Sequence, residues 1–565
     1  MTMARLARQE YRQAEALFWA FLARFFENEI SDNSSDMRSS FTRIIGMLAA
    51  PGMLLPVSNI FRWGLMLGIL GPVRFRMAIV ADKAVYLSLS IGAVLLLTAV
   101  VWQALLVDRR DAIVLGSFPV RTRVIVGAKV ASLLAYVGIV AFGMHIIAAF
   151  AYALLLATSA EDIVRGVFAH LVAGGMACMF ACLAVAAFQA TLLALGGPRL
   201  FARIAAPAQL ALATAGMLLL MMFPLMGGAA AAYVNGSNSV DWVLWMPPMW
   251  FVGVYEVIMG FPHRSMPELA WRAVMATGGA LALLIAMYPL AYRRIVSAAM
   301  TGSVISTRRS LGSVVLHWLV RRAPLAPDTR AATHFTFLTL ARVARHKLII
   351  ATALGAAVAL TLPFMVRWSA ATGLAAIPGR SHITVPIVFV LIGLAGLRMA
   401  FNVPSEPAAA WIFETAVRPA RIGLRAARIA AITAGGFVPA IVCLAAYAWF
   451  WNSLIAASLT ATLLALVGMI AEMSLRSLDF VPFTRRYNPE RSNLQARWPL
   501  FLLAGVIFLQ ILPSIIRLLL TADIYWLAPA VIAAVALTLR LTHPPEPPPL
   551  IDADHANKPL ALRLY

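Results

Sequence analysis

The sequence has little charge and little cysteine for its length. Asp, Glu, Lys and Arg make up 12% of the 565 residues, and 62% are hydrophobic, whereas a soluble domain averages about 25% charged residues. This composition excludes an ordinary water-soluble protein. Cys178, Cys182 and Cys443 are the only cysteines, and all lie within apolar runs. They exclude a secreted disulfide framework and are expected to be buried packing residues.

The motifs of common enzyme classes are also missing. A P-loop needs Gly-Lys followed by Ser or Thr, but the four lysines follow Asp82, Ala128, His346 and Asn557. No His-Glu-x-x-His or Gly-x-Ser-x-Gly motif occurs. We therefore expect a chain that is not an enzyme, with no catalytic residue, no metal ligand and no cofactor of its own. The N-terminal segment does not resemble a cleaved signal peptide, so we expect it to be retained.

Basic residues nevertheless outnumber acidic ones by 46 to 24. They lie in short clusters between long apolar runs, which is typical of the positive-inside rule and not of a nucleic-acid-binding surface. A membrane helix needs about 20 apolar residues. By that standard the sequence contains twelve candidate spans: 41–59, 84–107, 130–157, 166–194, 207–233, 273–292, 348–366, 384–401, 429–452, 455–475, 498–521 and 524–541.

The distribution of Lys and Arg predicts how these spans are oriented. If both termini are cytoplasmic, the inner segments hold 36 of the 46 basic residues and the outer segments hold 10. Arg62, Arg74 and Arg76 are an exception in an outer segment. Pro51 and Pro56 fall in the first span, which we expect to be broken or to extend towards residue 72.

The predicted fold is therefore an all-α polytopic membrane protein of about twelve spans in two six-helix halves. Residues 1–40 form an N-terminal amphipathic segment, 41–292 the first half and 293–347 a basic cytoplasmic linker ending in a second amphipathic segment. Residues 348–541 form the second half, and 542–565 a proline-rich tail expected to be disordered.

Both amphipathic segments are predicted to be interfacial elbow helices. In the second, the stretch is HFTFLTLARVARHKL, from His334. The alternative is that both are cytoplasmic helices packed on the rest of the chain. The apolar residues of the first fall at helical spacing: Leu17, Phe18, Phe21, Leu22 and Phe25.

Few ionisable residues fall within the predicted spans. Glu472 lies near the inner end of its span with Arg476 four residues on, so we expect a helix-end ion pair rather than a functional carboxylate. His145 and His170 are expected to be packing residues, with a role in proton transfer as the alternative. The spans therefore contain no predicted charge relay.

Two charged segments follow the second and eighth spans. We expect both to lie on the cytoplasmic surface, where a short helix could pass a push from a partner into the bilayer. The first contains Asp108, Arg109, Arg110, Asp111, Arg121, Arg123 and Lys129. The second, from Ser405, contains Glu406, Glu414, Arg418, Arg421, Arg425 and Arg428.

The chain resembles the ABC-2 type permeases, the membrane subunits of ATP-binding-cassette exporters, in their long duplicated twelve-span form. The resemblance covers most of residues 7–541. It rests on the charged start, Ser-x-Pro-Val-Arg core and Lys129 ending of the first segment, on an elbow helix followed by six spans, and on MPPMWFVGVYEVIMG from Met246. The second half departs from it, because its last two spans are joined by only a few residues around Asp523.

The resemblance implies a transport function. Segments 108–128 and 405–427 would be coupling helices, each seated on a separate P-loop ATPase subunit that binds ATP and Mg²⁺. The chain would export an unidentified substrate across the bacterial inner membrane. The outer residues Pro247, Pro248, Trp250, Phe251, Tyr255 and Glu256 would belong to short helices that dip into the outer leaflet, or else to a plain aromatic belt.

Two other functions are compatible with the same residues. A major-facilitator-like secondary transporter also has twelve spans and an Asp-Arg loop after the second, which Asp108, Arg109 and Arg110 would mimic. The loop here is longer, and Ala104 stands where that family has Gly. A membrane-embedded transferase would use Asp108 and Asp111 as catalytic carboxylates, although two acids beside two arginines are more typical of a solvated patch.

Overall fold

The computed structural model describes most of the apolar segments. The described residues are 3–26, 63–66, 68, 69, 75, 78–106, 109–221, 223–234, 236, 238–260, 265–300, 322, 324–369, 373–376, 381–405, 419–450, 452–475, 478, 480–484 and 511–542. The chain divides into two compact units. Unit 1 contains Met1–Ser306 and Val358–Ala376, and unit 2 contains Thr307–Ala357 and Ile377–Tyr565.

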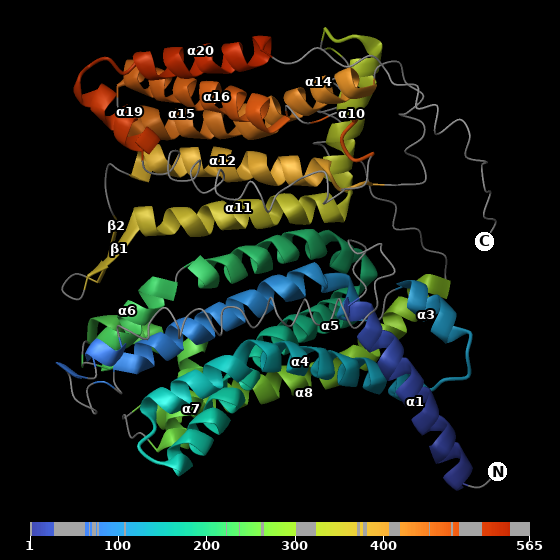
Figure 1. Cartoon of the computed structure of the whole chain (residues 1–565). Helices are drawn as coiled ribbons and strands as arrows, with labels where there is room; N and C mark the ends of the chain where they lie inside the picture. The colour runs from blue at the N-terminus through green and yellow to red at the C-terminus, as the bar shows by residue number, and fades with distance from the viewer. Residues whose placement is uncertain are drawn as a thin grey trace, which may run out of the picture. The chain divides into compact units, whose positions relative to one another are not determined.

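Unit 1 is built from long helices that extend through most of its described residues (Figure 1). A helix without a label in the figure, Ala78–Val100, is called helix 78–100 below. The labelled elements are α1 (Met3–Phe26), η1 (Trp102–Ala104), α3 (Arg109–Gly116), α4 (Thr122–Leu156), α5 (Ala160–Met221), α6 (Phe223–Val234), η2 (Asn238–Trp245), α7 (Pro247–Met259) and α8 (Met266–Met300).

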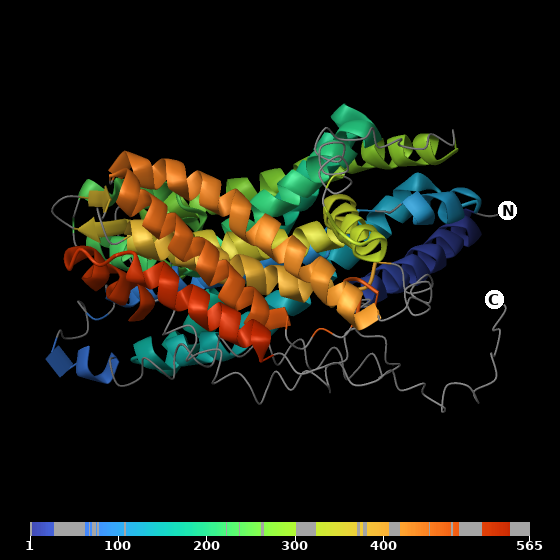
Figure 2. The same cartoon turned by 90° about the horizontal axis from the view of Figure 1, so that it is seen from above.

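Unit 2 is also largely helical. Its long helices lie side by side in the two views of Figures 1 and 2, with α16 packed on α12, α15 and α20. The division between the units falls within α11, whose residues up to Ala357 belong to unit 2 and whose residues from Val358 belong to unit 1. The elements are α10 (Pro327–Arg342), α11 (Ala344–Met365), α12 (Ser381–Phe401), α14 (Pro419–Ile432), the π-helix η4 (Thr433–Phe437), α15 (Val438–Phe450), α16 (Ser453–Leu475), α19 (Leu512–Thr521) and α20 (Leu527–Leu541).

Many of these helices are long and apolar enough to cross a bilayer. Among the described residues seven qualify alone, and a pair bent by 60°, Pro207–Leu220 with Leu225–Val234, adds an eighth if it is one span. The shorter apolar helices Ile349–Val358, Leu512–Thr521 and Leu527–Leu541 fall within three further predicted spans. Predicted span 41–59 lies outside the described residues. The chain is thus consistent with an α-helical membrane protein, and the count of twelve stays a prediction.

One short hairpin departs from the all-α prediction. In unit 1, β1 (Val366–Ser369) pairs antiparallel with β2 (Gly373–Ala376). The four residues of β1 alternate apolar and polar side chains, which is the period of a strand and not of a helix.

Helix α5 separates two predicted spans at a glycine. Gly197 has a φ of 71°, a conformation that favours glycine, and Pro198 follows it. The helix therefore breaks between predicted spans 166–194 and 207–233, where the sequence places their connection.

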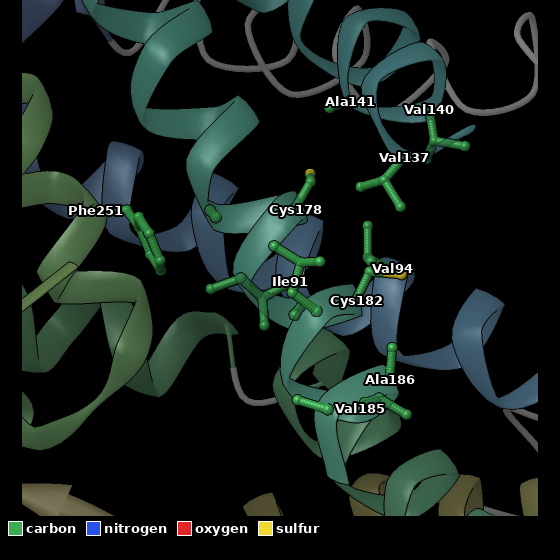
Figure 3. Close-up of a cluster of buried hydrophobic side chains, with 14 of the residues drawn as sticks. Ile91, Val94, Val137, Val140, Ala141, Cys178, Cys182, Val185, Ala186 and Phe251 are labelled. Atoms are coloured by element: carbon green, nitrogen blue, oxygen red, sulfur yellow. The ribbon is translucent and has the colours of Figure 1, made fainter. Parts of the chain in front are cut away.

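The core of unit 1 is formed by small residues as well as large ones. Cys178 and Cys182 of α5 lie in it as predicted, among Ile91 and Val94 of helix 78–100 and residues of α4 (Figure 3). Close packing of small residues lets helices approach where lipid removes the hydrophobic drive for association. The buried alanines of one α5 face recur at helical spacing: Ala169, Ala173, Ala177, Ala181, Ala186, Ala190 and Ala194.

The two predicted elbow helices differ in how they pack. Helix α1 turns its predicted apolar face towards α4, and Phe21, Leu22 and Phe25 are buried there. The second stretch is divided, because α10 ends at Arg342 and α11 begins at Ala344. Helix α10 packs on α14 and buries mainly threonines. The hydroxyls of Thr333 and Thr336 donate to carbonyls of their own helix, at 2.7 Å for Thr333 to Thr329. Intrahelical bonding lets a threonine face serve as a packing face.

Helix α8 is the most exposed of the candidate spans within its own unit, with 17% of its most apolar window buried. Trp271, Met275 and Ile285 are among its exposed side chains. A long apolar face of this kind is expected to be covered by lipid or by other protein.

A close helix approach in unit 1 yields a stability prediction. A Cβ at Gly92 of helix 78–100 would lie 2.7 Å from the Gly216 carbonyl oxygen, and a Cβ at Gly216 would lie 2.9 Å from that of Gly92. Gly92→Ala must push the backbones apart, so we expect a loss of about 1–3 kcal/mol, seen as a lower unfolding temperature in detergent.

Gly175→Ala is the matched control for this variant. A Cβ there meets nothing within 4 Å, so the higher helix propensity of Ala should leave stability unchanged or raise it by about 0.5–1 kcal/mol. Equal unfolding temperatures for the two variants would contradict the close approach.

Candidate functional site

The first predicted coupling segment contains a short helix, α3. Along the chain, α3 follows helix 78–100 and precedes α4, and in the fold it packs on α8. Asp108 lies outside the described residues, as do the side chains of Arg109 and Arg110 at the start of α3. Three apolar side chains are exposed here: Ile113 and Val114 of α3 and Phe118 in the turn after it are 55%, 57% and 57% exposed.

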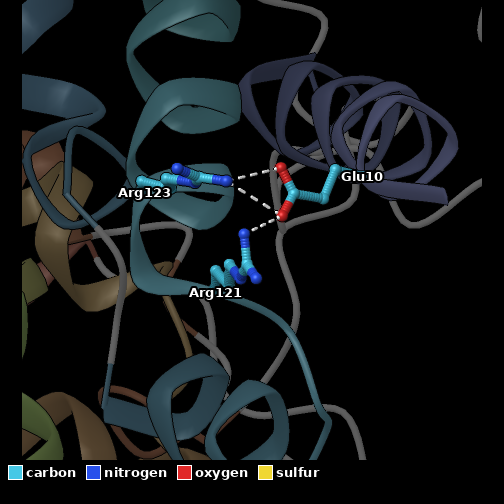
Figure 4. A network of polar contacts seen from close by, with 3 residues as sticks. All are labelled: Glu10, Arg121 and Arg123. Carbon is cyan, nitrogen blue, oxygen red and sulfur yellow. Dashed lines mark hydrogen bonds and ion pairs between the residues drawn. The ribbon is translucent and has the colours of Figure 1, made fainter. Parts of the chain in front are cut away.

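The described charged residues of this segment bind α1, and we call this group the elbow cluster: Glu10, Arg24, Asp111, Arg121 and Arg123. Glu10 accepts hydrogen bonds from Arg121 at 2.5 Å and from Arg123 at 2.9 Å (Figure 4). Arg24 forms an ion pair with Asp111. Such exposed pairs add about 0–1 kcal/mol each, so their effect is chiefly to orient α1 against α3 and α4.

Lys129 is buried at the same junction. Its ammonium lies 4.7 Å from the Phe21 ring centroid and 4.6 Å from that of Phe25. Phe25 in turn stacks on Tyr136 of α4. Lys129 thus holds α1 on α4 through cation–π contacts and offers no surface to a partner.

The second coupling segment is described only from Pro419. Glu406, Glu414 and Arg418 lie outside the described residues, whereas Arg421 and Arg425 are exposed on α14. Arg428 donates to Glu472 of α16 at 2.5 Å, and both side chains are largely buried. The partner found for Glu472 is therefore a residue from another helix, while Arg476, the predicted partner, lies outside the described residues.

The predicted outer region forms α7, whose first turn contains Pro247 and Pro248. Proline suits a first helical turn because the amide there has no intrahelical partner. Trp250 is half-buried and donates to the Leu244 carbonyl at 2.9 Å. Phe251, Tyr255 and Glu256 are buried, and α7 packs on α5 and α8 of unit 1.

Helix α7 brings Glu256 to a buried lysine. Lys83 of helix 78–100 and Glu256 are 4% and 3% exposed, and Lys83 Nζ lies 2.6 Å from Glu256 Oε1. The same ammonium lies 3.7 Å from the Tyr255 ring centroid. An ionisable pair inside a set of membrane-length helices marks a functional site by default, because each charge is costly in hydrocarbon.

Two histidines lie beside this pair. His145 of α4 and His170 of α5 are buried, with 3.2 Å between His145 Nδ1 and His170 Nε2. The other ring nitrogen of His145 lies 3.7 Å from Cys178 Sγ. A Cβ on Gly174 would lie 2.3 Å from His145 Nδ1, so only glycine leaves room for the ring. We call Lys83, Tyr86, His145, His170, Cys178, Tyr255 and Glu256 the buried polar cluster.

Sequence reasoning placed the histidines as separate packing residues and missed the Lys83–Glu256 pair. Lys83 precedes the second predicted span by one residue, and Glu256 lies in a helix too short to be a span. The sequence does contain a signal for the pair: Tyr255-Glu256 is a polar pair within an apolar stretch, and Lys83 is a cation at the start of a predicted span. Among the described residues, no three His, Cys, Asp or Glu side chains are placed to hold a metal ion.

No family model, curated protein or solved structure matches the chain. Its function must therefore be inferred from the geometry of its own side chains.

The Lys83–Glu256 pair predicts a strongly non-additive stability effect. Lys83→Met leaves the Glu256 carboxylate buried and unpaired, which costs about 3–5 kcal/mol, whereas an apolar replacement of both partners is often neutral. We expect Lys83→Met to unfold at a much lower temperature than wild type in detergent, and Lys83→Met with Glu256→Met to regain most of the loss. A double variant as unstable as the single would show that the two charges do not interact.

Proposed function

We propose that the chain is the permease subunit of an ABC-type exporter in a bacterial inner membrane. Two separate P-loop ATPase subunits would bind ATP and Mg²⁺ and drive it, and both termini would be cytoplasmic. The substrate would leave through the membrane part of the chain, which contains the apolar helices. The Lys and Arg distribution supports the orientation.

The observation that carries the proposal is the surface of α3. The short helix α3, which connects two membrane-length helices, exposes Ile113 and Val114, and the turn after it exposes Phe118. Asp111, Arg121 and Arg123 pair with α1, although Arg121 and Arg123 also stay exposed. Aromatic and aliphatic side chains that are exposed in the free protein are typical of the centre of a protein interface, where the partner buries them. This surface therefore fits a protein partner better than solvent.

The elbow cluster would couple movement of α3 to movement of α1 and α4. A push on α3 reaches α1 through Arg24–Asp111 and reaches α4 directly, and Lys129 holds α1 on α4. The three helices would then move together, so a partner's motion would reach the membrane part.

Co-purification with an ATPase tests the proposal. The ATPase encoded beside this chain should bind the wild-type chain in detergent, and Phe118→Asp with Val114→Asp should weaken binding by at least about tenfold, as expected for central interface residues. The matched control is Ile524→Asp, an exposed apolar residue in the loop between α19 and α20 that is expected on the outer side. Equal binding by both variants, or ATP hydrolysis by the isolated chain, would overturn the proposal.

A second candidate function is ion-coupled secondary transport. The buried polar cluster favours it, because ionisable groups among membrane helices are typical of ion and proton pathways. Transport by the chain alone in liposomes, driven by a proton gradient without ATP, would support this candidate against the first.

A further inference from the structure

The exposed apolar face of α8 leads to two arginines near the end of the helix. Leu283 and Leu290, seven residues apart, lie on one face and are 42% and 47% exposed. Arg293 and Arg294 follow Leu290 by three and four residues, so they lie on the same face one turn further along. Both arginines are exposed. This face of α8 therefore combines a hydrocarbon surface with guanidinium groups at one end.

Helix α5, which packs on α8, adds two more arginines at this end. Arg199 and Arg203 are exposed and four residues apart, just after the break at Gly197. Arg294 reaches this break, because its Nη1 lies 3.3 Å from the position that a Cβ on Gly197 would take. Leu195, on the other side of the break, is 70% exposed. We call Arg199, Arg203, Arg293 and Arg294 the arginine group.

The arginine group lacks a neutralising carboxylate. None of its four side chains forms an ion pair with an acidic residue in the part of the chain that the structure describes. Arg121 and Arg123 of the elbow cluster, by contrast, share Glu10. Arg272, near the other end of α8, pairs with Glu268 at 2.5 Å. Gathered positive charges without a counter-charge attract an anion.

The length of α8 places these arginines at the level of lipid headgroups. Trp271, which is 62% exposed, and Arg293 are 22 residues apart, or about 33 Å along a helix. The hydrocarbon core of a bilayer is about 30 Å thick. Tryptophan favours one interface and arginine extends its charge to the other. Leu283 and Leu290 then lie at the depth of the acyl chains, next to the arginine end.

The chemistry of this surface selects one kind of ligand. Guanidinium groups bind phosphate oxygens through paired, charge-assisted hydrogen bonds. A free phosphate would use only the arginines and would leave the apolar face of α8 uncovered. A zwitterionic phospholipid would bring a cationic group to four positive charges. An anionic phospholipid supplies a phosphate and acyl chains without that added cation, so it matches both parts of the surface.

We propose that α8 and the arginine group form a binding site for an anionic phospholipid in the leaflet at this end of α8. The guanidinium groups bind the phosphate, and the acyl chains lie along Leu283 and Leu290. In the predicted orientation this is the cytoplasmic leaflet. The inference goes beyond the proposed function and does not depend on the choice between the two candidate functions.

Native mass spectrometry of the full chain in detergent tests the selectivity of the site. The wild type should bind its first molecule of dioleoylphosphatidylglycerol at least about tenfold more tightly than dioleoylphosphatidylcholine. Arg293→Gln with Arg294→Gln should weaken the binding of the anionic lipid by about twenty-fivefold, or about fivefold for each arginine, and leave the zwitterionic lipid unaffected. Equal affinity of the wild type for the two lipids would overturn the proposal.

Two further double variants separate this site from a general effect of charge. Arg121→Gln with Arg123→Gln is the matched control, because it removes the same charge from arginines that already share Glu10. It should leave the first lipid affinity unchanged, and a loss as large as that of the α8 variant would refute a specific site. Arg199→Gln with Arg203→Gln should weaken anionic-lipid binding, and it replaces the α8 variant if that one fails to fold.

The position of the lipid and the source of the phosphate need separate measurements. A phosphatidylglycerol with a photoreactive acyl chain should label α8 around Leu283 and Leu290 in liposomes, and labelling confined to other helices would contradict the proposal. An excess of inorganic phosphate should not displace the lipid, since displacement would indicate a site for a free anion.

ATPase binding distinguishes the failure of this site from that of the proposed exporter. If Arg293→Gln with Arg294→Gln lost ATPase binding but kept its lipid affinity, the arginines would belong to a protein interface and the lipid site would be refuted. Selective lipid binding by a chain that binds no ATPase would refute only the exporter.

Discussion

Pairing of buried charges constrains how the helices of this chain can pack. A charge at the centre of a bilayer costs at least about 2.5–3.5 kcal/mol, so Lys83 is tolerated because the Glu256 carboxylate and the Tyr255 ring both contact it. Since Glu256 belongs to α7, that short helix must stay docked on helix 78–100, and its docking also buries Phe251 in the core. In unit 2, Arg428 and Glu472 tie α14 to α16 in the same way.

Small residues make this pairing possible. The alanine face of α5 and the missing side chain of Gly174 bring α4 and α5 close enough for His145 to contact both His170 and Cys178. Gly92 and Gly216 do the same for helix 78–100 and the second part of α5. The result is a closely packed interior in which polar side chains pair with one another or with backbone carbonyls, and hydrogen bonds are stronger in such surroundings than in water.

Hydropathy predicted the positions of the long helices, because a helix that crosses a bilayer needs a run of apolar residues, and such a run can be recognised from the sequence alone. It also placed the apolar face of α1 and the break near Gly197. The polar contacts could not be read in this way. Glu472 has a candidate partner four residues away in sequence, yet Arg428, 44 residues away, binds it. Lys83 and Glu256 are 173 residues apart, and only the folded helices bring them together.

Helix α8 leaves most of its apolar surface uncovered within unit 1. A soluble protein would aggregate through such a surface, whereas acyl chains solvate it without penalty. The composition of the surrounding lipid is thus expected to affect the packing of this helix, just as the solvent affects the conformation of a loop. Extraction that strips bound lipid should loosen α8 before it disturbs the alanine-lined interior, and a detergent with a longer alkyl chain should preserve the native packing of α8 better than a short one.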